Sequence, residues 1–217
     1  MNIEAYKNII QECKEKNVTL VAVSKTKPVE DILALYDLGQ RDFGENYVQE
    51  LIEKEKQLPK DIHWHFIGHL QTNKVKQIIS LVHLIHGVDS LKLLKEINKQ
   101  SEKVNKITNC LLQVHIAEEE TKFGLDEKEL NEIISKLADE QMKNVHVIGL
   151  MGMATNTSDE KQIRKEFHYL KSLQQVLQTE NYKLETLSMG MTADYKIAIE
   201  EGSNMIRVGS LIFGSRN

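Results

Sequence analysis

The hydrophobic and polar residues of this chain alternate between two patterns. One is a short, nearly unbroken apolar run, which is typical of a buried strand. The other places apolar residues at i, i+3, i+4 and i+7, the spacing of an amphipathic helix; an example is Val29, Ile32, Leu33 and Tyr36. The apolar runs predict strands over residues 20–23, 41–46, 63–68, 84–88, 110–116, 145–151, 184–188 and 204–208.

The intervals between these runs predict helices over residues 2–16, 28–38, 47–57, 72–82, 90–103, 126–137, 158–178 and 192–201. Pro28 suits a first helical position because it has a preset φ and no N–H group to leave unpaired. Asp126 and Glu129 have the spacing of a capping box. Residue types that cap the start of a helix also stand at Thr72, Ser90 and Thr192.

The strict alternation of strand and helix predicts parallel strands joined by helical crossovers. Eight such units close a (β/α)8 TIM barrel, here with an extra helix before the first strand. A doubly wound open sheet is the alternative, but no G-x-G-x-x-G follows the first predicted strand. We therefore predict an α/β fold with a single TIM-barrel domain over residues 1–217.

Composition narrows the possible functions. The net charge of −4 gives no reason to expect binding to nucleic acid or to an anionic membrane. The first residues are too polar for a signal peptide, and no apolar run approaches membrane-spanning length. Cys13 and Cys110 form no C-x-x-C pair and are predicted to be buried thiols in a reducing compartment. We expect a cytoplasmic protein that binds neither nucleic acid nor membrane.

The first candidate for chemistry is Lys25, which directly follows the predicted strand over residues 20–23. In α/β proteins the carboxyl ends of parallel strands form the ligand-binding edge. Burial at that edge disfavours the ammonium form of a lysine, and the neutral amine is the nucleophile that forms Schiff bases with carbonyl compounds. A solvated lysine in a turn is the competing interpretation of Lys25 taken alone.

Two loops near the end of the sequence have the composition of a phosphate site. Small residues and hydroxyls precede a predicted helix start in both of them, Ser188-x-Gly190-x-Thr192 and Arg207-x-Gly209-Ser210. Free N–H groups at a helix start bind anions, and barrels often form a phosphate site after strands seven and eight. Helix capping by Ser and Thr is the alternative for either loop alone.

A lysine amine and a phosphate site at one barrel mouth suggest a phosphorylated aldehyde or ketone held as a Schiff base. A sugar-phosphate aldolase and a protein that binds pyridoxal 5′-phosphate (PLP) both fit, and spacing alone does not separate them. His63, His65 and His69 suggest zinc only at first sight, because no further ligand has a fixed spacing to them. We interpret them as hydrogen-bonded structural residues and predict no metal.

Longer stretches of the sequence resemble one known family. They are LVAVSKTKP from residue 20, FGENYVQE from 43, WHFIGHLQTNK from 64, VIGLMGMA from 147, LSMGMTADYKIAIEEGS from 187 and MIRVGSLIFG from 205. With these motifs in order over nearly the whole chain, it resembles the PLP homeostasis proteins (the YggS/PROSC family). That family is similar to the N-terminal barrel of alanine racemase, so the resemblance implies a fold-type III PLP-binding barrel with PLP as its cofactor.

The resemblance implies a role for individual residues. Lys25 would carry PLP as an internal aldimine, and Asn46 would contact the ring or its hydroxyl. Arg207 would approach the pyridine nitrogen, where a cation disfavours protonation and makes the ring a weaker electron sink. Lys122 would stand beside the ring oxygen or be a solvated loop lysine, and Lys27 would be a second lysine at the mouth. The implied phosphate ligands are Ser188, Gly190, Met191, Thr192, Gly209 and Ser210.

The resemblance also implies a carrier rather than an efficient enzyme. In the racemases a second base, a Tyr, comes from a separate C-terminal domain, whereas this sequence ends at Asn217, directly after its last predicted barrel unit. No catalytic residue is therefore predicted. We expect a monomer that buffers PLP, maintains vitamin B6 and amino-acid homeostasis and hands PLP to apoenzymes. The alternative is a weak PLP-dependent amino-acid racemase that uses Lys25 as its base.

Overall fold

The computed structural model describes residues 1–119, 121–138, 142–178 and 183–214. Its strands form a closed parallel barrel in sequence order, in which β8 pairs with β1, so the predicted TIM barrel is confirmed. The strands are β1 (Thr19–Val23), β2 (Asp42–Glu45), β3 (His63–Phe66), β4 (Val82–Val88), β5 (Thr108–Gln113), β6 (Val145–Met151), β7 (Thr186–Ser188) and β8 (Met205–Val208).

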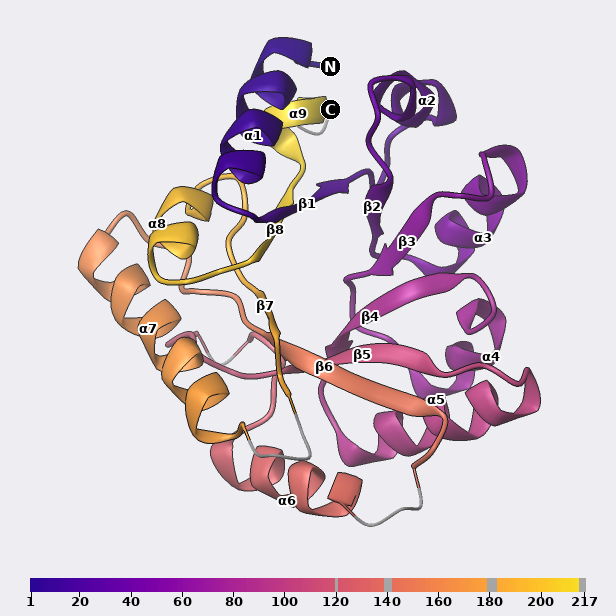
Figure 1. Ribbon diagram of the computed structural model, residues 1–217, viewed down its shortest axis with the longest axis vertical. Helices are drawn as coiled ribbons and strands as arrows, with labels where there is room; N and C mark the ends of the chain where they lie inside the picture. Colours follow the sequence, from indigo (N-terminus) through magenta and orange to yellow (C-terminus); the bar gives the residue numbers. More distant parts are fainter. Residues whose placement is uncertain (120, 139–141, 179–182, 215–217) are drawn as a thin grey trace.

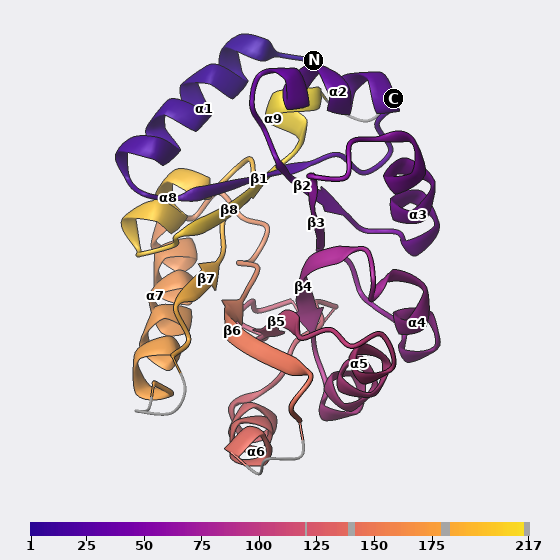
Figure 2. The same cartoon turned by 45° about the vertical axis from the view of Figure 1, so that its right-hand side comes forward.

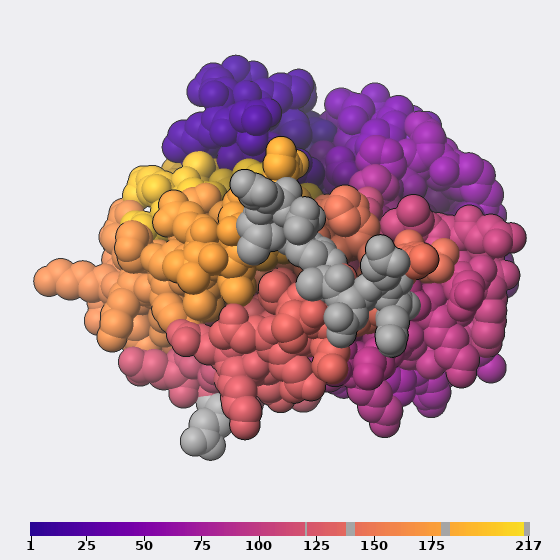
Figure 3. Space-filling model, turned by 60° about the horizontal axis from the view of Figure 1, so that its bottom comes forward, coloured from indigo at the N-terminus to yellow at the C-terminus, as the bar shows by residue number. Residues whose placement is uncertain are grey.

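Helices surround the barrel, and every helix after α1 lies in a segment that follows a strand (Figure 1). In the space-filling view, successive sectors of the chain accordingly follow one another around the molecule (Figure 3). No helix in the described ranges is both long and apolar enough to span a membrane. The helices are α1 (Ile3–Glu15), α2 (Val29–Asp37), α3 (Val48–Gln57), η1 (Thr72–Lys74, a 3-10 helix), α4 (Val75–Ile78), α5 (Leu91–Lys103), α6 (Glu127–Ala138), α7 (Glu160–Val176), α8 (Tyr195–Glu200) and α9 (Ser210–Phe213).

The extra helix α1 packs beside α9, so the first and last helices of the chain are neighbours (Figures 1 and 2). The backbone N–H of Asn2 donates to the carbonyl of Ile212 at 2.6 Å. Tyr6, Ile9 and Cys13 lie on the buried face of α1, as the helical spacing predicts. This packing covers the barrel where β8 meets β1.

The apolar core has two parts. The larger part lies between the outer surface of the barrel and the helices, and it contains the fully buried Phe43 and Phe167. Burial of each such side chain contributes roughly 1.5–3 kcal/mol. The smaller part is a separate cluster made by Val21, Leu84, Leu111, Met151 and Met205. Polar side chains, among them His65, His86 and Arg207, are also buried.

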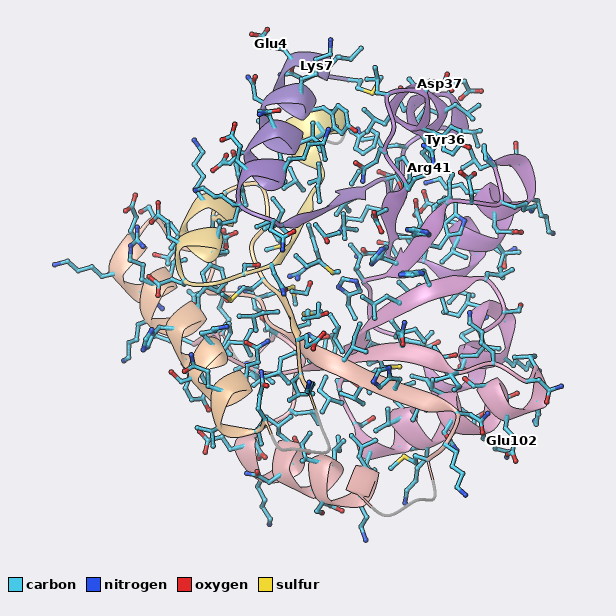
Figure 4. The ribbon with its side chains drawn as sticks, viewed as in Figure 1. Glu4, Lys7, Tyr36, Asp37, Arg41 and Glu102 are labelled. Atoms are coloured by element: carbon cyan, nitrogen blue, oxygen red, sulfur yellow. The ribbon has the colours of Figure 1, made fainter. Side chains whose placement is uncertain are left out.

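A surface cluster fixes the connection between α2 and β2. The guanidinium of Arg41 lies 3.7 Å from the centre of the Tyr36 ring, and the two side chains can be followed in Figure 4. Asp61 joins them, because it accepts from the Tyr36 hydroxyl at 2.7 Å and from Arg41 Nε at 2.9 Å. This cluster ties the start of β2 to the segment that follows α3.

Several predicted element ends match the structure. Strand β6 has the predicted bounds of 145 and 151. Ser90 caps α5 by accepting from the Leu93 N–H at 3.3 Å. Asp126 and Glu129 form the predicted capping box, in which each side chain accepts from the other's backbone N–H, at 2.8 and 3.1 Å.

Three predicted helix starts are wrong. Pro28 is the residue before α2, with extended ψ of 162°, rather than its first helical residue. Thr72 is the first residue of the 3-10 helix η1, whose start has no side-chain cap, and α4 begins three residues later, at Val75. Thr192 caps nothing: the Asp194 carboxylate accepts from the Met191 N–H at 2.6 Å and closes a turn of its own, so α8 starts at residue 195.

Candidate functional site

A cavity of about 310 Å³ opens at the carboxyl ends of β1, β2 and β8. Barrels place their ligands at this end because the loops after all eight strands meet there. The lining includes the second mouth lysine, Lys27. It also brings together most of the binding residues predicted from the sequence, namely Lys25, Asn46, Met191, Thr192, Arg207, Gly209 and Ser210.

Lys25 lies half-buried in the turn after β1. Both of its neighbours are fixed by carboxylates. The Ser24 hydroxyl donates to Glu45 Oε1, and the Thr26 N–H donates to Glu50 Oε1, each at 2.6 Å. Thr26 has a φ of +63°, a left-handed conformation that a residue with a side chain adopts only when its surroundings impose it.

Lys54 of α3 connects these two carboxylates. Its buried ammonium donates to Glu45 Oε1 at 2.8 Å, to Glu50 Oε1 at 2.6 Å and to the Ser24 carbonyl at 2.8 Å. All three ammonium hydrogens therefore have acceptors. Burial raises the pKa of Glu45, and the charge of Lys54 opposes that shift. We call Lys54, Glu45 and Glu50 the Lys54 clamp, because together they hold the turn that carries Lys25.

Asn46 follows β2 and places a carboxamide in the lining of the cavity. Its Oδ1 is buried and has no hydrogen-bond partner among the described residues. The neighbouring loop approaches closely because residue 68 is glycine: a Cβ there would lie 2.3 Å from the Asn46 carbonyl oxygen. A buried acceptor without a partner is costly, so the site fits a ligand that offers a hydrogen-bond donor at this point.

The loops after β7 and β8 meet on the other side of the cavity. The hydroxyl of Ser210 donates to that of Thr192 at 3.2 Å. Helix α9 begins at Ser210, and the first N–H groups of a helix have no partner within it. Two hydroxyls and backbone N–H groups that converge on one cavity are the donors by which proteins hold a phosphate.

Two predicted phosphate ligands lie outside the cavity lining. Ser188 is fully buried, and its hydroxyl oxygen is 2.6 Å from Arg207 Nη1 and 3.0 Å from His86 Nδ1. Gly190 shapes the turn instead: its φ is +96°, and a Cβ there would lie 2.6 Å from Ala198 Cβ. The structure therefore assigns both residues a supporting place behind the cavity wall, which differs from the predicted contact with phosphate.

Arg207 comes from the middle of β8 and is 4% exposed. Its Nη1 donates to the Ser188 carbonyl at 2.8 Å as well as to the Ser188 hydroxyl, and its Nη2 donates to the Gly152 carbonyl at 3.1 Å. Burial lowers the pKa of Arg207 to about 10, so the side chain stays charged at neutral pH. These hydrogen-bond acceptors are neutral oxygens, and the charge of Asp194 favours the charged form of the guanidinium, so Arg207 brings a positive charge to the cavity.

Lys122 lies elsewhere. Its ammonium donates to the carbonyl of Ala154 and pairs with the carboxylate of Glu119, and it is not among the residues that line the cavity. The structure thus gives no support to its predicted place beside a cofactor ring. It is also not the fully solvated lysine of the alternative interpretation.

The histidines proposed as structural residues are hydrogen-bonded, as predicted. His63 and His65 both contact Asp42 Oδ1, at 3.2 and 3.0 Å. His69 bonds to Asp89 at 2.8 Å and stacks on Phe123. Within the described ranges, no group of three or more His, Cys, Asp or Glu residues is arranged to hold a metal ion.

Comparison with known proteins agrees with the architecture. The family model of the alanine racemase N-terminal domain matches residues 2–217. A pyridoxal phosphate homeostasis protein of Aquifex aeolicus is 41% identical over 204 residues, which cover 93% of this chain and 89% of that protein.

Two solved structures of PipY from Synechococcus elongatus are also similar. The structure without PLP has a TM-score of 0.92 and 32% identity, and the match covers 99% of this chain and 100% of that one. The structure with PLP bound has a TM-score of 0.84 and 34% identity, with 91% and 93% covered. This chain therefore belongs to the alanine racemase N-terminal domain family and, within it, to the pyridoxal phosphate homeostasis proteins.

Proposed function

We propose that this protein binds PLP in the cavity, with Lys25 as the covalent attachment point. The observation that carries the proposal is the convergence of the Lys25 amine, one unpaired amide oxygen, one buried guanidinium and a pair of hydroxyls on a single cavity. The names of its relatives and the PLP-bound PipY structure support the same ligand.

Each residue would meet a different part of the cofactor. The Lys25 amine would bind the aldehyde carbon as a Schiff base, with loss of one water. The unpaired Asn46 oxygen would accept a hydrogen bond from the ligand. Arg207 would face the pyridine nitrogen. Thr192, Ser210 and the N–H groups beside them, together with the backbone of Met191 and Gly209, would hold the phosphate.

The electrostatics of Arg207 favour a carrier over an efficient enzyme. PLP supplies an electron sink for amino-acid chemistry when its ring nitrogen is protonated, and enzymes that use it so place a carboxylate there. A guanidinium that is charged at neutral pH opposes that protonation. We therefore propose that the protein stores PLP, releases it to apoenzymes and so maintains vitamin B6 and amino-acid homeostasis. We expect it to be a cytoplasmic monomer.

A second candidate function is a weak PLP-dependent amino-acid racemase. It is favoured by the membership of the alanine racemase N-terminal domain family and by a lysine amine that lines the cavity and would act as the base. The two functions differ in turnover, since a carrier transfers its cofactor whereas a racemase retains it and converts its substrate.

Titration of three proteins with PLP tests the binding site. In absorbance titrations, the wild-type protein should develop a visible band of protonated Schiff base, and Lys25→Ala should not. Lys27→Ala is the matched control, because Lys27 lines the same cavity two residues away, and it should keep the band. A Lys25→Ala protein that binds PLP covalently in the same cavity would overturn the assignment.

Mixing the PLP-loaded protein with an excess of an apoenzyme tests the carrier role. The proposal predicts that the apoenzyme gains activity as this protein loses its visible band. Chiral chromatography of incubations with single L-amino acids serves as the second arm. Saturable racemisation that Lys25→Ala abolishes would favour the racemase and contradict the carrier.

A further inference from the structure

Five polar side chains form one hydrogen-bonded array, which we call the interior network. Asp42 Oδ1 is 3.0 Å from His65 Nε2, and His65 Nδ1 is 2.9 Å from His86 Nε2. His86 Nδ1 is 3.0 Å from the Ser188 hydroxyl, which is 2.6 Å from Arg207 Nη1. Strands β4 and β7 are not neighbours in the barrel, so the contact between His86 and Ser188 crosses its interior.

The network runs from one end of the barrel to the other. Asp42 is the first residue of β2, and its side chain is 27% exposed. The side chains of His65, His86 and Ser188 are buried, and each residue exposes 1% or less of its surface. Arg207, at the far end, lines the cavity. A continuous polar path therefore joins the amino-terminal end of the barrel to the site at its carboxyl end.

The donors and acceptors allow one consistent direction. A carboxylate only accepts, so His65 Nε2 carries a hydrogen, and in the neutral form of His65 the Nδ1 atom accepts. His86 then donates from Nε2 and accepts at Nδ1, and the group that donates to it is the Ser188 hydroxyl. The lone pairs of the Ser188 oxygen are thus turned toward Arg207, which only donates. Every member of the network donates toward Asp42.

Charges along the path agree with this arrangement. Burial lowers the pKa of His86 well below its ordinary value, and the charge of Arg207 acts in the same direction, so His86 is neutral. Burial acts to raise the pKa of Asp42, but the effects opposed to burial, hydrogen bonds from His65 and His63 among them, outweigh it and lower that pKa overall. A permanent carboxylate therefore stands at the accepting end.

We propose that His86 is a positioning residue for Arg207: acting through Ser188, it fixes the guanidinium in the cavity and thereby sets how the pocket binds PLP. The inference rests on the proposed function, because it takes PLP to be the ligand that Arg207 meets. Without an acceptor at His86, the Ser188 hydroxyl has to turn its hydrogen elsewhere, and its lone pairs no longer point at the guanidinium.

Four variants separate this role from general packing. His86→Leu removes the acceptor, and Ser188→Ala removes one oxygen atom. His86→Gln restores an acceptor and a donor at a spacing close to that of the imidazole nitrogens. His63→Gln is the matched control, because His63 contacts the same Asp42 oxygen but lies off the path to Arg207. Each protein is titrated with PLP at one pH, and the dissociation constant and the position of the visible band are recorded.

We expect His86→Leu and Ser188→Ala to weaken PLP binding about tenfold and to shift the band in the same direction. His86→Gln should return the wild-type band and most of the affinity, and His63→Gln should change neither. Wild-type affinity and band position in both His86→Leu and Ser188→Ala would overturn the proposal. A shifted band in His86→Leu with an unchanged Ser188→Ala would also overturn it, because the effect would not pass through Ser188.

Thermal unfolding of each apoprotein shows whether a variant has a folding defect. If His86→Leu does not fold, His86→Phe takes its place, since a phenyl ring is close to the imidazole in shape and offers the Ser188 hydroxyl no acceptor. Failure of the proposed function gives a different result: the wild-type protein would then develop no visible band and would carry no phosphopyridoxyl group on Lys25 after borohydride reduction.

Discussion

At the scale of single residues, the reactive lysine depends on side chains that do not touch the ligand. Lys25 is held because its two neighbouring residues are bonded to Glu45 and Glu50, and Lys54 forms an ion pair with each of these carboxylates. A buried ion pair of this kind adds little net stability, but its disruption leaves an uncompensated charge. Its main effect here is to fix one turn of the barrel mouth.

Substitution of Lys54 should therefore be costly. Lys54→Met leaves the buried Glu45 without its counter-charge, and we expect the free energy of unfolding to fall by about 3 kcal/mol. Urea denaturation followed by circular dichroism measures this. Lys56→Met, an exposed position of the same helix, is the control and should change little. Equal free energies of unfolding for the two variants would show that the Lys54 clamp does not stabilise the fold.

Asp42 gives a pH-dependent prediction. Its pKa in the folded protein lies below the ordinary 3.8, chiefly through the hydrogen bond and charge of His65, which outweigh the effect of burial. A lowered pKa means stability that is present above pH 3.8 and is lost as the pH falls through the folded-state pKa. The difference in unfolding free energy between wild type and Asp42→Asn should thus be full at pH 5 and shrink below about pH 4. A difference that grows on acidification would contradict this.

The sequence predicted the residues that line the cavity better than it predicted the buried side chains to which they are hydrogen-bonded. Lys25 and Asn46 could be placed because each stands at the carboxyl end of a predicted strand. Ser188 was predicted to contact phosphate, yet its hydroxyl is bonded to His86, which is distant in sequence. The predicted third and fourth strands contain His65 and His86. The sequence does not show which side chains meet across the interior of a barrel, so the interior network was not predicted.

At the scale of elements, the loop after β7 shows how turn geometry decides function. Strand β7 is only three residues long, and Gly190 must adopt a positive φ so that α8 can fold back against β8. The predicted cap at Thr192 is wrong because Asp194, and not Thr192, precedes α8. The loop forms its own turn through Asp194, which leaves the Thr192 hydroxyl at the cavity.

A comparison of Gly190 with Gly39, which follows α2, separates backbone strain from steric overpacking. Gly39 and Gly190 have φ of +97° and +96°, but a Cβ on Gly39 meets nothing within 4 Å, whereas one on Gly190 meets Ala198 Cβ at 2.6 Å. Gly39→Ala should cost about 1 kcal/mol of unfolding free energy from strain alone. Gly190→Ala should cost about 2–4 kcal/mol, because overpacking is added. Equal costs in chemical denaturation would rule out the steric argument.

Element boundaries were predictable where local chemistry sets them. The capping box at Asp126 and the cap at Ser90 depend on residues three positions apart, and both are present in the structure. Thr72 was not predictable from sequence, because a 3-10 turn intervenes before α4. Local signals thus identified the alternation of strands and helices, while tertiary packing moved individual helix starts.

At the scale of the whole molecule, the barrel is unevenly closed. Strands β1 and β8 are paired at four positions, whereas β7 and β8 are paired at one, Ser188 with Met205. Three backbone hydrogen bonds beyond the paired position also cross this seam, from Asn204, Met189 and Arg207 to the carbonyls of Leu187, Met205 and Gly190. The side chains of Ser203 and Arg207 add bonds to the carbonyls of Leu187 and Ser188. The proposed phosphate-binding loops leave the barrel at the same seam.

Hydrogen exchange should detect this seam. Regions with few paired backbone groups open at lower free energy, so amides of β7 should exchange faster than those of β4 and β5. Bound PLP would tie the loops after β7 and β8 together and should slow exchange there more than in β4. Mass spectrometry of the apoprotein and the PLP-loaded protein measures both effects. Uniform protection around the barrel in the apoprotein would contradict the uneven closure.

The central claim is that Lys25 holds PLP covalently. The most direct measurement is the visible absorption spectrum of the protein, loaded with PLP, before and after borohydride reduction, followed by peptide mapping. The account predicts a yellow band that disappears on reduction and a phosphopyridoxyl mass fixed on Lys25. A protein that stays colourless with added PLP, or a mass fixed on Lys27 with Lys25 unmodified, would contradict it.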